Sequence, residues 1–228
     1  MHPLFISFQN KTTMNKLFLF AVFCLPLFIS ACKKDDNDED NQAGASDYYI
    51  TDIYENTNRP GFVLLNLNAY QQTTEYTCGP ASALTLLHYY HREGDEMSIA
   101  SEMHTSTSTG TTPENLATWL GNNGFIVNWG ENGTLEMIRQ NLANNTPTLL
   151  EWSDWGGHWV LAVGYDTRNT EDPMDDVIIF ADPYDRHDDL VDGIDWFNAQ
   201  RFYYMWYDAL LFDRVMHRVY ITATPESK

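Results

Sequence analysis

The segment Gln71–Ser82, QQTTEYTCGPAS, contains the only cysteine beyond residue 32 of this 228-residue chain. The apolar residues that follow Cys78 recur at helical spacing, which predicts a helix over residues 79–91 with Pro80 in its first turn. A thiol at this place has four possible roles. It can be a small buried side chain, a metal ligand, half of a disulfide, or a nucleophile whose thiolate is favoured by the helix dipole.

The N-terminal residues resemble the export signal of a bacterial lipoprotein. Residues 14–31, MNKLFLFAVFCLPLFISA, place a lysine before an apolar run shorter than the roughly 20 residues of a membrane span, and Met14 is the expected start of translation. The tetrad Ile29-Ser30-Ala31-Cys32 resembles a lipobox, in which cleavage precedes a cysteine that then carries lipid. The alternative is a secretory signal with an incidental cysteine. We therefore expect an exported protein that Cys32 anchors to a bacterial membrane, at the outer membrane or the cell surface.

The residues after Cys32 predict a tether and a strongly acidic mature protein. Residues 33–46, KKDDNDEDNQAGAS, have no apolar surface to bury and are expected to be a disordered, acidic tether. The net charge of the whole chain is −19, and removal of residues 1–31 takes away two lysines and no acidic residue, which gives −21. Such a charge argues against nucleic acid as a partner. Residues 47–228 remain as one domain of about 180 residues.

Export also limits the roles open to Cys78. Cys24 leaves with the signal and lipid occupies Cys32, so a disulfide within the chain has no second thiol, and an unpaired cysteine is unusual in an oxidising compartment. The sequence predicts no metal site, because one thiol remains and the pair His88 and His91 lacks a third ligand at useful spacing. The acidic stretch 172–195 does not follow the EF-hand pattern and is interpreted as a solvated loop.

Helical patterns come first in the domain and strand patterns follow, which indicates an α+β fold. The predicted helices span residues 79–91, 113–120 and 134–142, and the predicted extended segments are 62–67, 148–152, 159–165, 177–181 and 218–222.

His158 is the candidate base among the seven histidines of the chain. It stands at the head of an apolar strand, directly behind two glycines that leave room for a substrate backbone. A hairpin centred on Thr170 pairs this strand with the next one, placing His158 directly opposite Asp182 and Ala162 opposite Ile178. The sequence therefore predicts that a histidine and a carboxylate meet at one end of the hairpin.

These features together resemble the papain-like cysteine peptidases, specifically the bacteriocin-processing (double-glycine leader) peptidases and their stand-alone relatives. The resemblance rests on Gln72, Cys78-Gly79-Pro80-Ala81-Ser82, Gly157-His158 and Asp182-Pro183, and it extends over about residues 64–224. The chain departs from the exporter-linked members at Thr77, where those usually have aspartate.

The resemblance implies a papain-like fold with N-terminal helices packed on a mainly antiparallel sheet. It implies that Cys78 is the nucleophile and His158 the general base and then acid. Asp182 would orient His158, and Gln72, rather than its neighbour Gln71, would stabilise the oxyanion with the Cys78 N–H. A peptide or protein would be hydrolysed through a thioester, without metal or cofactor. The alternatives are a papain-like module that binds without catalysis, and a transglutaminase-like acyl transferase.

Overall fold

The computed structural model describes residues 53, 58–185, 192–208 and 212–227. The predicted signal, Cys32, the tether and the domain boundary at residue 47 all lie outside these ranges. The chain divides into the compact units Met1–Tyr49 and Ile50–Lys228, and all the described residues belong to the second. Within them, no helix has the length and apolar character needed to cross a membrane.

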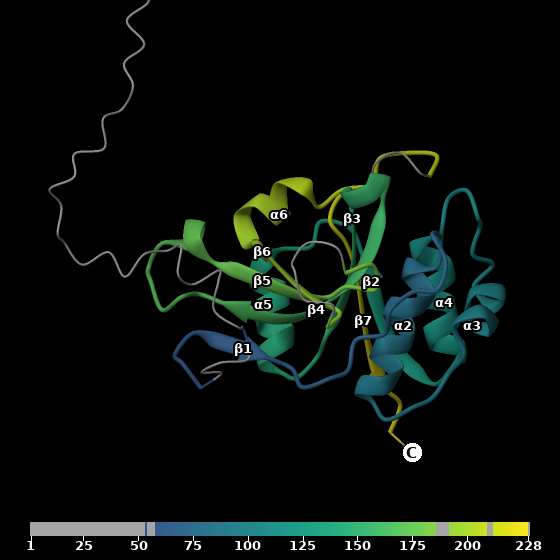
Figure 1. Cartoon of the computed structure of the whole chain (residues 1–228), viewed down its shortest axis with the longest axis horizontal. Coiled ribbons are helices and arrows are strands. Elements are labelled where there is room, and N and C mark those ends of the chain that lie inside the picture. The colour runs from purple at the N-terminus through teal and green to yellow at the C-terminus, as the bar shows by residue number, and fades with distance from the viewer. Residues whose placement is uncertain (1–52, 54–57, 186–191, 209–211, 228) are drawn as a thin grey trace, which may run out of the picture. The chain divides into compact units, whose positions relative to one another are not determined.

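A seven-stranded sheet organises the domain (Figure 1), and every strand pairing in it is antiparallel. Its order is β2-β7-β3-β4-β5-β6, and β1 pairs with the far end of β4. The strands are β1 (Phe62–Leu64), β2 (Phe125–Gly130), β3 (Thr148–Trp152), β4 (His158–Asp166), β5 (Val177–Ala181), β6 (Ile194–Asn198) and β7 (Val219–Pro225). Strand β4 is buried along its whole length and pairs with three others, and its first residue, His158, pairs with Trp152 of β3.

Helices pack against the sheet at several places. Helix α2 contacts β4 and also α3 and α4, α4 contacts β2, α5 contacts β1, β3 and β4, and α6 contacts β5 and β6. Figure 1 shows α2, α3 and α4 gathered beside one part of the sheet. The described α-helices are α2 (Cys78–Tyr89), α3 (Glu96–Glu102), α4 (Pro113–Asn122), α5 (Leu135–Ala143) and α6 (Ala199–Met205), with short 3-10 turns η1 (Asp154–Gly156) and η2 (Pro173–Asp175).

Side-chain caps mark where four of the described α-helices begin. The side chain of Asp95 accepts a hydrogen bond from Ser98 N at the start of α3, and Thr112, Thr134 and Asn198 accept equivalent bonds at α4, α5 and α6. Helix α2 differs, because its N-cap Thr77 makes no such bond. The first N–H groups of a helix have no acceptor within the helix, so the start of α2, at Cys78, keeps donors that no side-chain cap occupies.

The structure confirms the α+β fold and the helices on a mainly antiparallel sheet. Strands 148–152 and 177–181 have the predicted bounds. Helices α3 and α6 and strands β2 and β6 were not predicted, since their apolar residues are too few or too aromatic to show a clear period. Helix α2 is buried on all sides from Cys78 to Leu87, rather than on a single face, because it lies between β4 and two other helices.

The predicted register of the hairpin is wrong. Ala162 pairs with Phe180 instead of Ile178, and Leu161 pairs with Ala181. A β-bulge between Ala162 and Gly164 shifts the rest of the ladder by one residue. The prediction failed because it assumed a regular hairpin centred on Thr170. The β-bulge in β4 and the 3-10 turn η2 between β4 and β5 both disturb that regularity.

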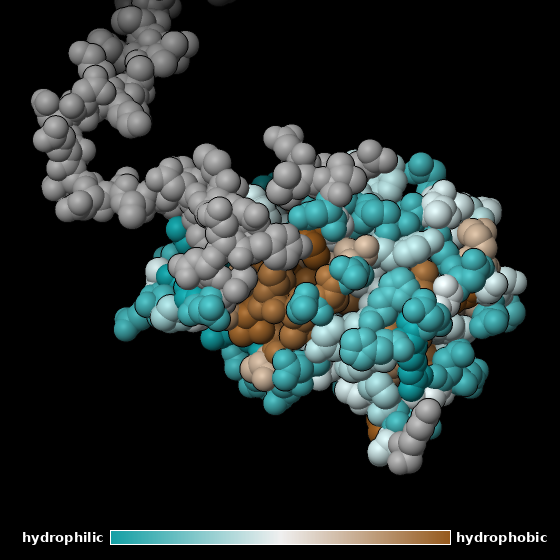
Figure 2. Space-filling model, turned by 60° about the horizontal axis from the view of Figure 1, so that its bottom comes forward, coloured by the Kyte–Doolittle hydropathy of each residue, from teal (hydrophilic) through white to brown (hydrophobic). Residues whose placement is uncertain are grey.

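Polar residues cover much of the domain surface. Most of the face drawn in Figure 2 is hydrophilic, with hydrophobic residues gathered near its centre. The large hydrophobic side chains that are exposed, such as Ile126, Met174 and Tyr204, come from different elements. Single exposed apolar residues of this kind are normal on a soluble domain.

Candidate active site

Cys78 is the first residue of α2 and is a free cysteine with 8% of its surface exposed. Gly79 lets this helix end come close to its neighbours: a Cβ added there would lie 2.8 Å from Thr111 Oγ1 and 3.3 Å from the Trp159 ring. The Trp159 indole N–H in turn donates to Thr111 O at 2.9 Å, and Ser82 Oγ donates to Trp159 O at 3.0 Å. These contacts join the start of α2 to β4 one residue after His158.

His158 and Asp182 form a buried pair, as the sequence predicts. His158 Nε2 lies 2.7 Å from Asp182 Oδ1, and the two side chains are 4% and 1% exposed. The observed register still allows this contact. Asp182 directly follows β5 and lies diagonally across from His158 on the same face of the sheet, and such diagonal neighbours remain within reach of long side chains. Tyr184 N also donates to Asp182 Oδ1 at 2.7 Å, which holds the carboxylate in place.

The surroundings of His158 favour its protonated form. Burial lowers the pKa of the imidazole, but the charge of Asp182 and hydrogen bonds with Asp182 and Cys78 outweigh it and raise the pKa to about 10. Because Asp182 occupies Nε2, Nδ1 is the nitrogen left for the hydrogen bond with Cys78. The histidine therefore lies between the thiol and the carboxylate.

The two glutamines before Cys78 have different surroundings. Gln71 Nε2 donates to Asp182 O at 2.8 Å, so its amide serves to hold the Asp182 segment. Gln72 is tied to the same segment by its backbone, since Gln72 N donates to Pro183 O at 2.8 Å. Its side-chain Nε2 donates one hydrogen bond, to Thr74 O at 2.6 Å. An amide NH₂ carries two N–H groups, so Gln72 retains a donor that this bond does not use.

A buried glutamate on α3 organises the segment that leads to Cys78. Glu96 is 2% exposed and accepts hydrogen bonds from Thr73 N at 2.9 Å, from Thr73 Oγ1 at 2.7 Å and from the hydroxyl of Thr77. Tyr70 OH donates to it at 3.2 Å. Thr77, the departure from the family pattern, thus binds a carboxylate that a different helix supplies. Glu96 was not predicted as part of the site, because its burial depends on the packing of α3 against α2.

We expect Glu96→Ala to destabilise the domain by about 2–4 kcal/mol, because several buried donors would lose their acceptor at about 1–3 kcal/mol for each unsatisfied group. Urea unfolding followed by circular dichroism measures this. Glu93→Ala, at an exposed residue three positions earlier, is the matched control and should change the free energy of unfolding by less than about 0.5 kcal/mol. Equal stability of the two variants would contradict the role given to Glu96.

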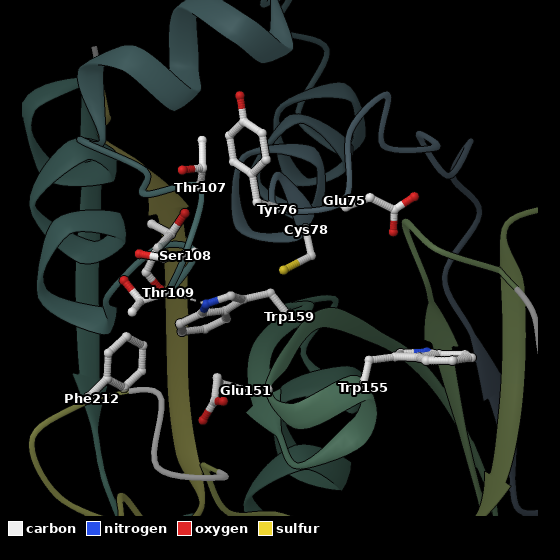
Figure 3. Close-up of a pocket in the computed structure, with 13 residues that line it drawn as sticks. Glu75, Tyr76, Cys78, Thr107, Ser108, Thr109, Glu151, Trp155, Trp159 and Phe212 are labelled. Carbon is white, nitrogen blue, oxygen red and sulfur yellow. Dashed lines mark hydrogen bonds between the residues drawn. The ribbon is translucent and has the colours of Figure 1, made fainter.

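A cavity of about 150 Å³ opens beside Cys78 (Figure 3). Its walls include the loop 107–111 and four aromatic residues, Tyr76, Trp155, Trp159 and Phe212. Glu151 also lines it. This glutamate was not singled out from the sequence, although a lone charge in the apolar strand Thr148–Trp152 was a signal available there.

The glycines before His158 adopt backbone conformations that suit glycine alone. Gly156 has φ of 90° and Gly157 φ of 139°, and nothing lies within 4 Å of a Cβ added at Gly156. Trp155 beside them has φ of 51° and is 62% exposed. Gly157 lines the cavity next to Cys78. The turn 155–157, with its positive φ angles, therefore forms part of the cavity wall at the place where the sequence predicts that a substrate backbone approaches. Across the described ranges, no three His, Cys, Asp or Glu side chains converge in a way that could hold a metal ion.

Comparisons with known proteins agree with this fold and show the family. The model of the family described as "Peptidase_C39 like family" matches residues 64–209. The peptidase domain of Streptococcus ComA, a bifunctional ABC transporter involved in a quorum-sensing pathway, superposes with a TM-score of 0.52 at 14% identity, covering 71% of this chain and 100% of that one. A putative C39-like peptidase from Bacillus anthracis gives 0.52 at 15% identity, covering 73% and 99%. No curated protein matches the chain.

Proposed function

This chain belongs to the Peptidase C39-like family, and from that membership and the geometry of its site we propose that it is a cysteine peptidase. Cys78 is the nucleophile, His158 the general base and acid, Asp182 the orienting group, and the substrate is a peptide or protein. The observation that supports the proposal is the buried pair of His158 and Asp182, with 2.7 Å between Nε2 and Oδ1, whose imidazole also interacts electrostatically with Cys78 at the start of α2. Nucleophilic catalysis by cysteine requires a thiol, an imidazole and a carboxylate in this order.

Catalysis begins with the transfer of the Cys78 proton to His158, whose raised pKa favours the cationic ring. The sulfur attacks the carbonyl carbon of the scissile peptide bond and an oxyanion forms. Collapse of this intermediate breaks the C–N bond, and the departing amine takes the proton from His158. The product of this step is a thioester on Cys78.

Hydrolysis of the thioester uses the same groups again. His158 removes a proton from water, the hydroxide attacks the thioester carbonyl, and the thiol leaves with the proton returned by His158. Asp182 stabilises the imidazolium in both halves of the reaction and keeps Nδ1 directed at the sulfur. The oxyanion receives hydrogen bonds from the uncapped Cys78 N–H and from Gln72 Nε2.

Gln72→Ala is expected to lower kcat by about 10²–10³-fold with little change in KM, because it removes a donor that acts on the transition state. Steady-state kinetics with a fluorogenic peptide measures this. Gln71→Ala is the neighbouring comparison and should act mainly through stability, since its amide holds Asp182 O. If Gln72→Ala kept full kcat, Gln72 would not be the oxyanion donor.

A peptide-library digest tests the proposed reaction and separates it from the alternatives. Wild-type protein is incubated with the library with and without an added primary amine, and the products are read by mass spectrometry. New C-terminal carboxylates support hydrolysis, and products that carry the amine support acyl transfer. An absence of products together with a Cys78 that iodoacetamide labels no faster than free cysteine below neutral pH would support the non-catalytic binding module.

We further propose that the peptidase is exported and anchored by lipid on Cys32, as its N-terminal sequence suggests. Expression in a bacterium supplied with a labelled fatty acid should give a labelled protein in the membrane fraction. Cys32→Ala should abolish the label and release the domain, because a lipid chain provides the membrane affinity. An unlabelled wild-type protein in the soluble exported fraction would instead support the plain secretory signal.

A further inference from the structure

Glu151 is a buried carboxylate that the proposed mechanism does not use. It lies on β3, directly opposite Trp159 on β4, and is 1% exposed. Neither Oε1 nor Oε2 has a hydrogen-bond partner among the described residues, yet the side chain lines the cavity beside Cys78. Buried carboxylates are normally paired or hydrogen-bonded, so this one has acceptor capacity directed at whatever enters the cavity.

The walls of the cavity suit a cation rather than an anion. The described lining contains a second carboxylate, Glu75, and no lysine or arginine. Asp208, which is fully buried, also acts electrostatically on Glu151. In the view of Figure 3 the Trp159 ring lies between Cys78 and Glu151. Aromatic faces attract lysine and arginine as well, so carboxylate and ring favour the same kind of ligand.

The surroundings of Glu151 favour its neutral form. Burial is the largest cause that raises the pKa of Glu151, Asp208 and Cys78 raise it further, and His158 opposes them, so that the pKa is about 9. These groups alone therefore leave the carboxyl protonated at neutral pH. A cation beside it would act in the opposite direction and favour the ionised form.

We propose that this cavity is a specificity pocket for a lysine or arginine side chain of the substrate, close to the scissile bond, with Glu151 as its counter-ion. The inference rests on the proposed function, because it assumes that the cavity holds part of a peptide substrate. A volume of about 150 Å³ corresponds to about five waters at roughly 30 Å³ each and is the size of a cavity that binds benzene, so it admits most of either side chain. The binding of the cation would release the Glu151 proton below pH 9.

Binding can be measured without turnover in the Cys78→Ala protein. Pooled peptides carry lysine, arginine, norleucine or citrulline at one position, with the other positions randomised, and isothermal titration calorimetry gives their affinities. We expect at least one position at which lysine binds about tenfold tighter than norleucine, or arginine than citrulline. Calorimetry at pH 7 in buffers of different ionisation enthalpy should report the release of close to one proton for the cationic peptides alone.

Glu151→Gln in the same protein should remove both the preference and the proton release, because the amide has the same shape without the charge. Glu114→Gln, at an exposed position on α4, should change neither. Glu151→Gln should also raise the melting temperature, and more at pH 8 than at pH 5, since an acid whose pKa is raised on folding costs stability above its unfolded pKa. A cooperative melting transition at this higher temperature would also demonstrate that the Glu151→Gln protein is folded.

Cleavage by proteins with Cys78 intact separates this inference from the proposed function. Cleavage concentrated beside lysine or arginine in wild type, and redistributed in Glu151→Gln, supports both. Tight binding of cationic peptides without any cleavage would support the specificity pocket and contradict the proposed peptidase activity. Cleavage with equal rates for cationic and neutral peptides, equal affinities in calorimetry, or a preference that survives Glu151→Gln would overturn the pocket.

Discussion

Cys78→Ala should reduce kcat/KM by on the order of 10⁴-fold or more and leave the domain folded, because it removes the atom that forms the thioester. The loss is larger than for any other single change at the site, since the remaining groups have no nucleophile to activate. Stability should change by less than about 1.5 kcal/mol, because a single partly accessible sulfur is lost. Far- and near-UV circular dichroism checks the fold, and the rate of peptide cleavage checks the activity.

Cys78→Ser serves as the control, because it retains a hydroxyl at the start of α2 and a partner for His158. It should also be strongly impaired, since an alcohol is much harder to deprotonate than a thiol. A fully active Cys78→Ala protein would remove the proposed mechanism. If circular dichroism shows that Cys78→Ala is unfolded, its inactivity carries no information about the mechanism. The activity of folded Cys78→Ser then tests whether the thiol is required.

Asp182→Asn should reduce kcat/KM by about 10²–10⁴-fold, less than Cys78→Ala, because the thiol and imidazole remain but the imidazolium loses its partner. The same change should lower the pKa of His158 from about 10, since the charge of Asp182 and its hydrogen bond are the main causes that raise it. NMR titration of the His158 ring, or the pH dependence of Cys78 alkylation, reports this shift. Asp154→Asn, in the turn η1 shortly before His158, is a neighbouring control that should leave the NMR titration of His158 and the pH dependence of Cys78 alkylation unchanged.

Stability gives a second test of the same pair. The pKa of His158 is raised on folding from an unfolded value of about 6.5 to about 10. The stability that this group contributes is therefore complete below pH 6.5 and is lost as the pH rises toward 10. Wild type should lose stability over this window, and Asp182→Asn should lose less. Parallel curves for the two proteins would indicate that the His158–Asp182 pair does not stabilise the fold.

The local elements of this protein could be predicted where the residues alone favour one conformation. Strand 148–152 follows Pro147 and contains three apolar residues, one threonine and one charge, and it appears as predicted. Helix α2 begins one residue before the predicted start, because glycine and proline in its first turn are compatible with a helix end. The α+β class and the meeting of His158 with Asp182 follow from such local signals and the order of the elements.

The site required information that no local pattern contains. The β-bulge changes the register of β4 and β5, and the His158–Asp182 contact survives because side chains on one face can reach diagonally. The different surroundings of Gln71 and Gln72 follow from hydrogen bonds to backbone carbonyls more than 100 positions away, donated by the side chain of Gln71 and by the backbone of Gln72. Glu96 looks like an ordinary surface charge in the sequence, and the position of Glu151 in a mostly apolar strand does not reveal what it faces.

The sequence alone was enough to predict the family and to propose a nucleophile and its base, because those residues occupy element ends that short-range rules can locate. The burial of Glu96 under the Thr77 segment, and of Glu151 in the cavity beside Cys78, was settled by packing between distant elements. Desolvation and the charges of neighbours govern what a carboxylate does, and both depend on residues brought together only when the chain folds.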